Sequence, residues 1–115
     1  MNEEHSLRFA NALKRLSGDA ELLTAMASIV SDDAPEIVTE LETQLQAGDT
    51  TAIVAAAHKL KGMCSTFEEG HPVSLLEDVI HSARGGAVDE ARITYSRCAP
   101  EIHELLQEIA NLRDG

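Results

Sequence analysis

The chain has 115 residues and a formal net charge of −11 at pH 7, from 20 acidic and nine basic side chains. Its apolar share of 43% comes mainly from Ala, Leu, Ile and Val, with two Phe, one Tyr and no Trp. This length suits one domain with a single core, and the acidity argues against binding to nucleic acid or to anionic membranes, because clustered Lys and Arg are needed to bind phosphate groups.

Cysteine usage and hydropathy give no sign of secretion. Cys64 and Cys98 form neither a C-x-x-C motif nor a dense disulfide pattern, so we expect them to be reduced core residues. No apolar run has the length of a signal peptide or a transmembrane helix. We therefore expect a cytoplasmic segment without membrane contact, although a domain cut from a longer membrane protein would look the same.

Helical periodicity begins near the N-terminus. A short helix is predicted over 4–16, and a second one follows a capping residue, Asp19. Further on, Asp33 and Glu36 resemble a capping box around Pro35, so we expect a kink or brief break there. The inward positions of these first helices are predicted to be Leu7, Phe9, Ala10, Leu13, Leu16, Leu22, Leu23, Met26, Ile29 and Val30.

Two helices are predicted on either side of a glycine. The segment 35–47 ends at Gly48, and Asp49 can cap the next helix, which spans 52–67. In that helix apolar residues alternate at spacings of four and three, which places them on one face. This apolar stripe should face the core, and it consists of Ile53, Ala57, Leu60, Cys64 and Phe67.

The C-terminal half predicts two more helices. Glycine and proline in 68–72 end the preceding helix, and 73–84 forms the next one, closed by Gly85-Gly86. Asp89 can cap the last helix, in which Pro100 predicts a kink or break just before it. The inward positions of the last helix are predicted to be Ile93, Ile102, Leu105, Leu106, Ile109 and Leu112.

The order of elements predicts the fold class. No stretch shows the alternation of a strand or the residues of a tight hairpin turn. Helices of roughly 12–25 residues joined by loops of about 2–6 residues favour antiparallel neighbours. The predicted fold is all-α: an antiparallel up-down-up-down four-helix bundle with one or two short additional N-terminal helices. The core of the bundle is expected over about 34–113 of a single domain that spans 1–115.

His58 lies well away from the apolar stripe of the helix 52–67. On a helical wheel it is roughly 140° from the centre of the stripe, with Lys61, Gly62 and Ser65 as its neighbours. The imidazole should therefore project into water. A mid-helix glycine costs about 0.5–1 kcal/mol relative to alanine, which suggests that something comes close to the helix at Gly62.

The residues around His58 resemble a known signature. Ala57 to Gly62 reads A-H-K-L-K-G, similar to the His-x-(Leu or Ile)-Lys-Gly signature of histidine-containing phosphotransfer (HPt) domains of bacterial two-component phosphorelays. The likeness covers roughly 7–112. The further segments that carry it are D-A-P-E-I-V-T-E-L at 33–41, A-G-D at 47–49 and S-A-R-G-G at 82–86.

The resemblance implies that His58 accepts a phosphoryl group from the phospho-aspartate of a receiver domain and passes it to the aspartate of a response regulator. A neutral imidazole keeps a ring nitrogen free for in-line attack. Lys61 would offset the charge of the phosphate. The resemblance and the helical wheel together assign contact with the partner to Ala55, Lys59, Gly62 and Ser65.

The partners implied are receiver domains of response regulators and a hybrid sensor histidine kinase, contacted by a monomer. No cofactor or metal is expected on this domain, because Mg²⁺ would be held by the receiver. No glycine-rich phosphate loop of the Walker form is present, so we expect a phosphocarrier without autokinase activity. The pairs Glu68/His71 and Asp78/His81 imitate a di-iron spacing, but matching inward glutamates are missing.

Two alternatives stay open. One is a chemotaxis-kinase-type phosphotransfer domain that a histidine kinase domain phosphorylates directly, which Thr66-Phe67 slightly favours. The other is a non-catalytic helical adaptor that binds receivers without carrying phosphate. The sequence departs from the family pattern at Met63 and Cys64, which are bulkier than usual, and at Glu68, which takes the place of a glycine. These departures concern docking.

Overall fold

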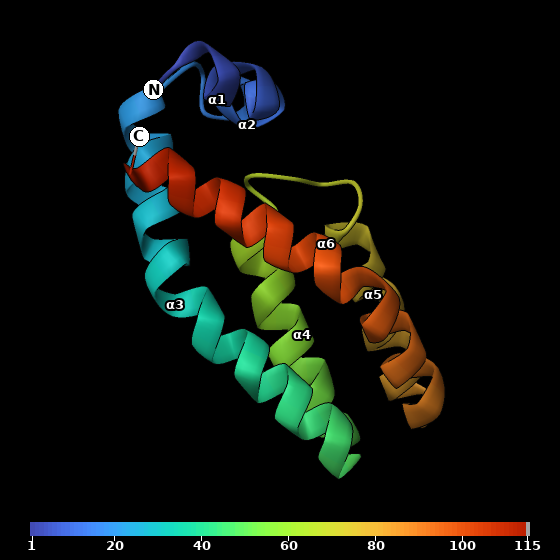
Figure 1. Ribbon diagram of the computed structural model, residues 1–115. Coiled ribbons are helices and arrows are strands. Elements are labelled where there is room, and N and C mark those ends of the chain that lie inside the picture. The colour runs from blue at the N-terminus through green and yellow to red at the C-terminus, as the bar shows by residue number, and fades with distance from the viewer. Residues whose placement is uncertain (115) are drawn as a thin grey trace.

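Helices make up the fold of the part of the chain that the structure, a computed structural model, describes. It covers residues 1–114, and Gly115, the last residue of the predicted domain, lies outside them. Within that range no residue is assigned to a strand. The helices are α1 (Glu3–Arg8), α2 (Ala10–Arg15), α3 (Ala20–Ala47), α4 (Thr50–Cys64), α5 (Val73–Arg84) and α6 (Val88–Asp114). The predicted all-α fold is confirmed (Figure 1).

The four longer helices form a closed bundle. α3 packs on α4, α4 on α5, α5 on α6, and α6 returns to pack on α3. Short connections at 48–49, 65–72 and 85–87 join them, so each helix runs antiparallel to the one before it (Figure 1). The predicted up-down-up-down arrangement is therefore confirmed.

Gly48 and Asp49 separate α3 from α4 as predicted, and α4 begins at Thr50 rather than at 52. Gly48 has a φ of 75°, a left-handed conformation that favours glycine, and ends α3. Oδ1 of Asp49 then accepts a hydrogen bond from the backbone N–H of Ala52 at 3.1 Å. α4 ends at Cys64, and a turn continues to Phe67. The whole predicted stripe is buried: Ile53, Ala57, Leu60, Cys64 and Phe67.

At two prolines a kink or a break was predicted, and the break is not found. α3 passes through Pro35 and α6 through Pro100, and Figure 1 shows both helices curving but continuous. A proline inside a helix costs about 3 kcal/mol because it removes one hydrogen bond and crowds the preceding turn. Both prolines face solvent, and the buried stripes of α3 and α6 continue on either side of them. Packing of these stripes outweighs the local penalty.

Two predicted caps and several predicted inward positions are also wrong. Asp33 lies within α3 and caps nothing, and Asp89 lies in the first turn of α6, where it forms an ion pair with Arg92 at 2.9 Å. Each helix buries the single face that stays in register along its whole length. The residues predicted to face inward that are exposed instead are Leu7, Ala10, Leu22, Ile29 and Ile93.

Two short helices close one end of the bundle in place of the single helix predicted over 4–16. The chain breaks at Phe9, whose side chain is 1% exposed and packs edge-on against Phe67, with ring centroids 5.7 Å apart. Arg8 pairs with Glu108 at 2.7 Å and with Glu68 at 3.2 Å. These contacts hold α1 and α2 over the connection 65–72 and over α6 (Figure 1).

Candidate functional site

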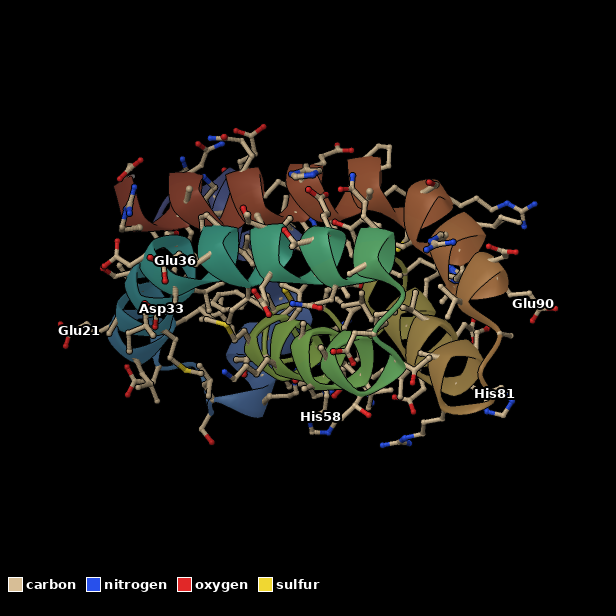
Figure 2. The ribbon with its side chains drawn as sticks, turned by 90° about the horizontal axis from the view of Figure 1, so that it is seen from below. Glu21, Asp33, Glu36, His58, His81 and Glu90 are labelled. Atoms are coloured by element: carbon tan, nitrogen blue, oxygen red, sulfur yellow. The ribbon has the colours of Figure 1, made fainter. Side chains whose placement is uncertain are left out.

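His58 occupies the solvent side of α4. Its side chain is exposed, and Figure 2 shows the imidazole pointing away from the bundle. The predicted neighbours lie on the same side of the helix: Ala55, Lys59 and Gly62 are exposed, and Lys61 and Ser65 are partly exposed. The structure thus brings all of the predicted site residues to one accessible face.

Gly62 leaves the helix backbone bare next to this histidine. A Cβ atom built on Gly62 would meet no heavy atom within 4 Å. The glycine is therefore not required for packing within the described part of the chain. It does leave open space one helical turn beyond His58, as a second protein would need in order to approach closely.

Lys61 is paired with a carboxylate of the neighbouring helix. Its Nζ donates a hydrogen bond to Oε2 of Glu77 on α5 at 2.5 Å. This hydrogen bond, followed by the charge of Lys61, holds the pKa of the Glu77 carboxyl below its ordinary value, and the charges of Arg84 and His58 act in the same direction. The ammonium that was predicted to offset phosphate charge already has an anionic partner.

Glu77 is a residue that the sequence reasoning missed. The short connection between α4 and α5 could have revealed it. In two antiparallel helices joined by such a connection, a residue of one helix lies opposite the residue of the other that is equally far from the middle of the connection. Lys61 and Glu77 are equally far along the chain from Glu69, so an antiparallel hairpin of helices places them opposite each other.

Lys59 and Ser65 differ in their freedom to meet a partner. No ion pair is found for Lys59 anywhere in 1–114, so its ammonium is available beside His58. Oγ of Ser65 instead donates a hydrogen bond to the carbonyl oxygen of Gly62 at 3.1 Å. Ser65 would have to give up this bond before donating to a phosphoryl oxygen.

A shallow groove runs beside the histidine, between α3 and α4. It encloses about 400 Å³, and small side chains of α4 form one of its walls. Its lining residues are Glu36, Ile37, Glu40, Ala52, Ala55, Ala56 and Lys59. Two of the residues predicted to contact a partner, Ala55 and Lys59, therefore border a surface depression.

Both cysteines belong to the core, as predicted. Cys64 and Cys98 are buried and unbonded to each other. Burial raises the pKa of the Cys64 thiol to about 12 and that of Cys98 to about 11. Since the thiolate is the reactive form, neither side chain is a nucleophile at neutral pH.

The described residues, 1–114, were also compared with the donor sets of metal sites and with the length of membrane-spanning helices. Over that range no group of three or more His, Cys, Asp or Glu side chains is placed to hold a metal ion. His81 points outward from α5 (Figure 2). Nor does any helix of the described residues combine the length and apolar character needed to cross a membrane.

A four-helix bundle that presents a histidine one turn before a bare glycine on an accessible helix face has the form of a histidine phosphotransfer domain. The sequence profile of the Hpt domain family matches residues 25–115, most of the chain, and the chain therefore belongs to this family. The resemblance noted around His58 is confirmed at the level of the family.

Full-length relatives are much longer proteins. The chain is 27% identical over 112 residues to the signal transduction histidine-protein kinase BarA of Shigella flexneri and to that of Escherichia coli (strain K12). The alignment covers 97% of this chain but 12% of each relative. No solved structure matches the chain significantly.

Family membership defines the general role. That role is phosphotransfer in two-component signal transduction.

Proposed function

We propose that His58 accepts a phosphoryl group from the aspartate of one receiver domain and passes it to the aspartate of a response regulator. The observation that supports this assignment is the exposed imidazole on a helix whose next turn is bare at Gly62. A phospho-aspartate held by another protein can reach only a nucleophile that no side chain of this domain covers. His58 meets that requirement.

The proposed transfer exchanges a P–O bond for a P–N bond. A ring nitrogen of neutral His58 attacks phosphorus with its lone pair while the aspartyl P–O bond breaks, and the bonding electrons return to the carboxylate. The ring keeps the proton on its second nitrogen and is cationic until that proton leaves to solvent. In the second transfer the carboxylate of the response regulator attacks phosphorus, and the electrons of the P–N bond return to the imidazole.

The neighbours of His58 would assist in different ways. Lys61, on the α5 side of His58, and Lys59, on the α3 side, would offset the negative charge of the phosphoryl group. Gly62 would give the partner's loops room to approach, and the groove at Ala55 would receive one of its side chains. Mg²⁺ is expected on the receiver, where it would neutralise charge on the transferring group.

The assignment is tested with receiver domains that have been phosphorylated by acetyl phosphate. After mixing, we expect phosphate on the domain that is labile in acid and stable in base. It should be absent from the His58→Gln variant and undiminished in His81→Gln, a matched control at another exposed histidine. Label that persists in His58→Gln would overturn the assignment.

The same labelling experiment, repeated with a histidine kinase domain and ATP as the phosphoryl donor, separates the alternatives. Label that is obtained from a histidine kinase domain and ATP, but from no receiver, would indicate a chemotaxis-kinase-type domain. A domain that binds receivers and is labelled by neither donor would be an adaptor that carries no phosphate.

A further inference from the structure

Glu77 is an anion in contact with the lysine of the proposed phosphotransfer site. The Lys61–Glu77 pair joins α4 to α5 with an N–O distance of 2.5 Å, and the two side chains are 37% and 51% exposed. The pair is reachable from solvent, so both side chains can rearrange when the charge around them changes. His58 lies three residues before Lys61, one turn along the same helix.

Phosphorylation of His58 would change that charge. A phosphoryl group carries roughly two negative charges near neutral pH and has several strong acceptor oxygens. Lys61 lies close enough along the helix to serve it, yet its ammonium is already hydrogen-bonded to the Glu77 carboxylate. Two anions, one fixed on α5 and one transient on α4, therefore compete for the ammonium of Lys61.

Resting on the function proposed above, we infer that Glu77 is a positioning residue that weakens the hold of the domain on its phosphoryl group. In the unphosphorylated domain it keeps Lys61 against α5. In the phosphorylated domain it draws the ammonium away from the phosphoryl oxygens, which makes the phosphohistidine a readier donor to the next aspartate. This competition would suit a domain that must pass on the phosphoryl group that it accepts.

The competition predicts the direction of an equilibrium. Replacing Glu77 with Gln keeps the size of the side chain and removes its charge, so Lys61 is freed for the phosphoryl group. We expect the equilibrium between phosphohistidine and receiver phospho-aspartate to shift about two- to fivefold toward the phosphohistidine, the range typical of an exposed ion pair. The ratio is measured at equilibrium by phosphate-affinity electrophoresis after mixing the domain with a receiver phosphorylated by acetyl phosphate.

A matched control removes the same charge elsewhere. Glu90 is an exposed carboxylate on α6, a helix that is not next to α4 in the ring, and Figure 2 shows it well away from His58. Glu90→Gln should leave the ratio unchanged. An equal shift in Glu77→Gln and Glu90→Gln would attribute the effect to net charge and overturn the inference.

A double substitution tests whether Glu77 acts through Lys61. In a Lys61→Met background the effect of Glu77→Gln should fall to less than half of its size in the wild type. An undiminished effect would mean that Glu77 repels the phosphoryl group directly, and no effect in either background would mean that it does nothing. Both results would overturn the inference.

Failure of the inference is distinct from failure of the proposed function. If the wild-type domain is never phosphorylated on His58, the proposed function is wrong. If it is phosphorylated normally and Glu77→Gln leaves the equilibrium ratio unchanged, the function stands and only the role of Glu77 is wrong. The ³¹P chemical shift of the phosphohistidine, followed as a function of pH, gives a second readout. Glu77→Gln should change this pH dependence more when Lys61 is present than in the Lys61→Met background.

Discussion

Different side chains of α4 serve packing in the bundle and exposure of the histidine. Ile53 and Leu60 are fully buried and hold the helix in the bundle, whereas His58 faces solvent on the opposite side. A surface side chain contributes little to folding free energy, so changes at His58 should leave the domain folded. Stability and phosphotransfer are therefore separable by mutation at this helix.

Gly62 allows that separation to be tested. Because a Cβ at this position meets nothing, Gly62→Ala should stabilise the domain by about 0.5–1 kcal/mol and leave transfer intact. Gly62→Gln should be similarly well folded but slow transfer from a phosphorylated receiver by about tenfold or more, because the longer side chain displaces the partner. Thermal unfolding followed by circular dichroism and the rate of labelling report the two quantities.

Either of two results would contradict this view of Gly62. Equal transfer rates for the Ala and Gln variants would mean that no partner approaches the bare backbone. Loss of helical structure in Gly62→Ala would mean that the glycine is needed for folding.

At the scale of elements, the turn between α3 and α4 places the histidine helix. Gly48 reverses the chain, and the guanidinium of Arg92 on α6 donates to the carbonyl oxygens of Leu45 at 2.7 Å and Gln46 at 3.2 Å. These carbonyls lie in the last turn of α3 and have no partner within the helix. Asp49 satisfies the corresponding N–H group at the start of α4.

Removal of the Asp49 cap should destabilise the domain. Asp49→Ala leaves the N–H of Ala52 without its acceptor and should cost about 1 kcal/mol, measured by urea unfolding. The control is Asp89→Ala, which removes an aspartate that caps no helix and is mostly exposed. A loss of stability in Asp89→Ala as large as that in Asp49→Ala would contradict the assignment of the cap.

The continuity of α3 and α6 explains three of the mispredicted inward residues, Leu22, Ile29 and Ile93. If α3 were two helices, the buried face of its first half could differ from that of its second half, and Leu22 and Ile29 would fit the core. The actual helix runs through Pro35, so the register of Val38 and Leu41 extends backward and selects Leu23. In α6 the same effect buries residues in register through Pro100 and leaves Ile93 outside.

At the scale of the whole molecule, the N-terminal helices form a lid over one end of the bundle. α1 has no buried residue and α2 has one, so Phe9 between them is the one large side chain of this segment that is fully buried, while Leu13 and Leu16 pack against the core partly buried. The salt bridges of Arg8 lie at the surface and contribute little by themselves. We therefore expect Phe9 to be the largest single contribution to attachment of the lid.

Phe9→Ala should detach this lid. Truncation of a buried phenylalanine typically costs about 3–5 kcal/mol of folding free energy. Here the loss should not exceed the free energy with which α1 and α2 are held on the bundle, because the rest of the domain can stay folded without them. Hydrogen exchange should show lost protection at the amides of 3–15 while α3 to α6 stay protected. Leu7→Ala, at a residue that is 75% exposed, is the control, and it should change neither the stability of the domain nor the protection of 3–15. Unchanged protection of 3–15 in Phe9→Ala would contradict this account.

Local chemistry in the sequence was sufficient for the helical class, the glycine and aspartate that separate α3 from α4, the buried stripe of α4 and the exposure of His58. Each of these features depends on residues that are close in sequence: the left-handed turn at Gly48, the cap at Asp49, or the spacing of apolar residues along one helix. Such signals act before any tertiary structure forms, so the sequence alone determined them.

Tertiary structure decided the features that need a second helix. Pro35 and Pro100 are tolerated because the packing of long buried stripes outweighs a local penalty, and Phe9 interrupts its helix to reach Phe67. The Lys61–Glu77 pair likewise exists only because α5 lies beside α4. Helical periodicity shows which side of a helix is apolar, whereas only packing shows which helix lies against that side and which charges it brings to His58.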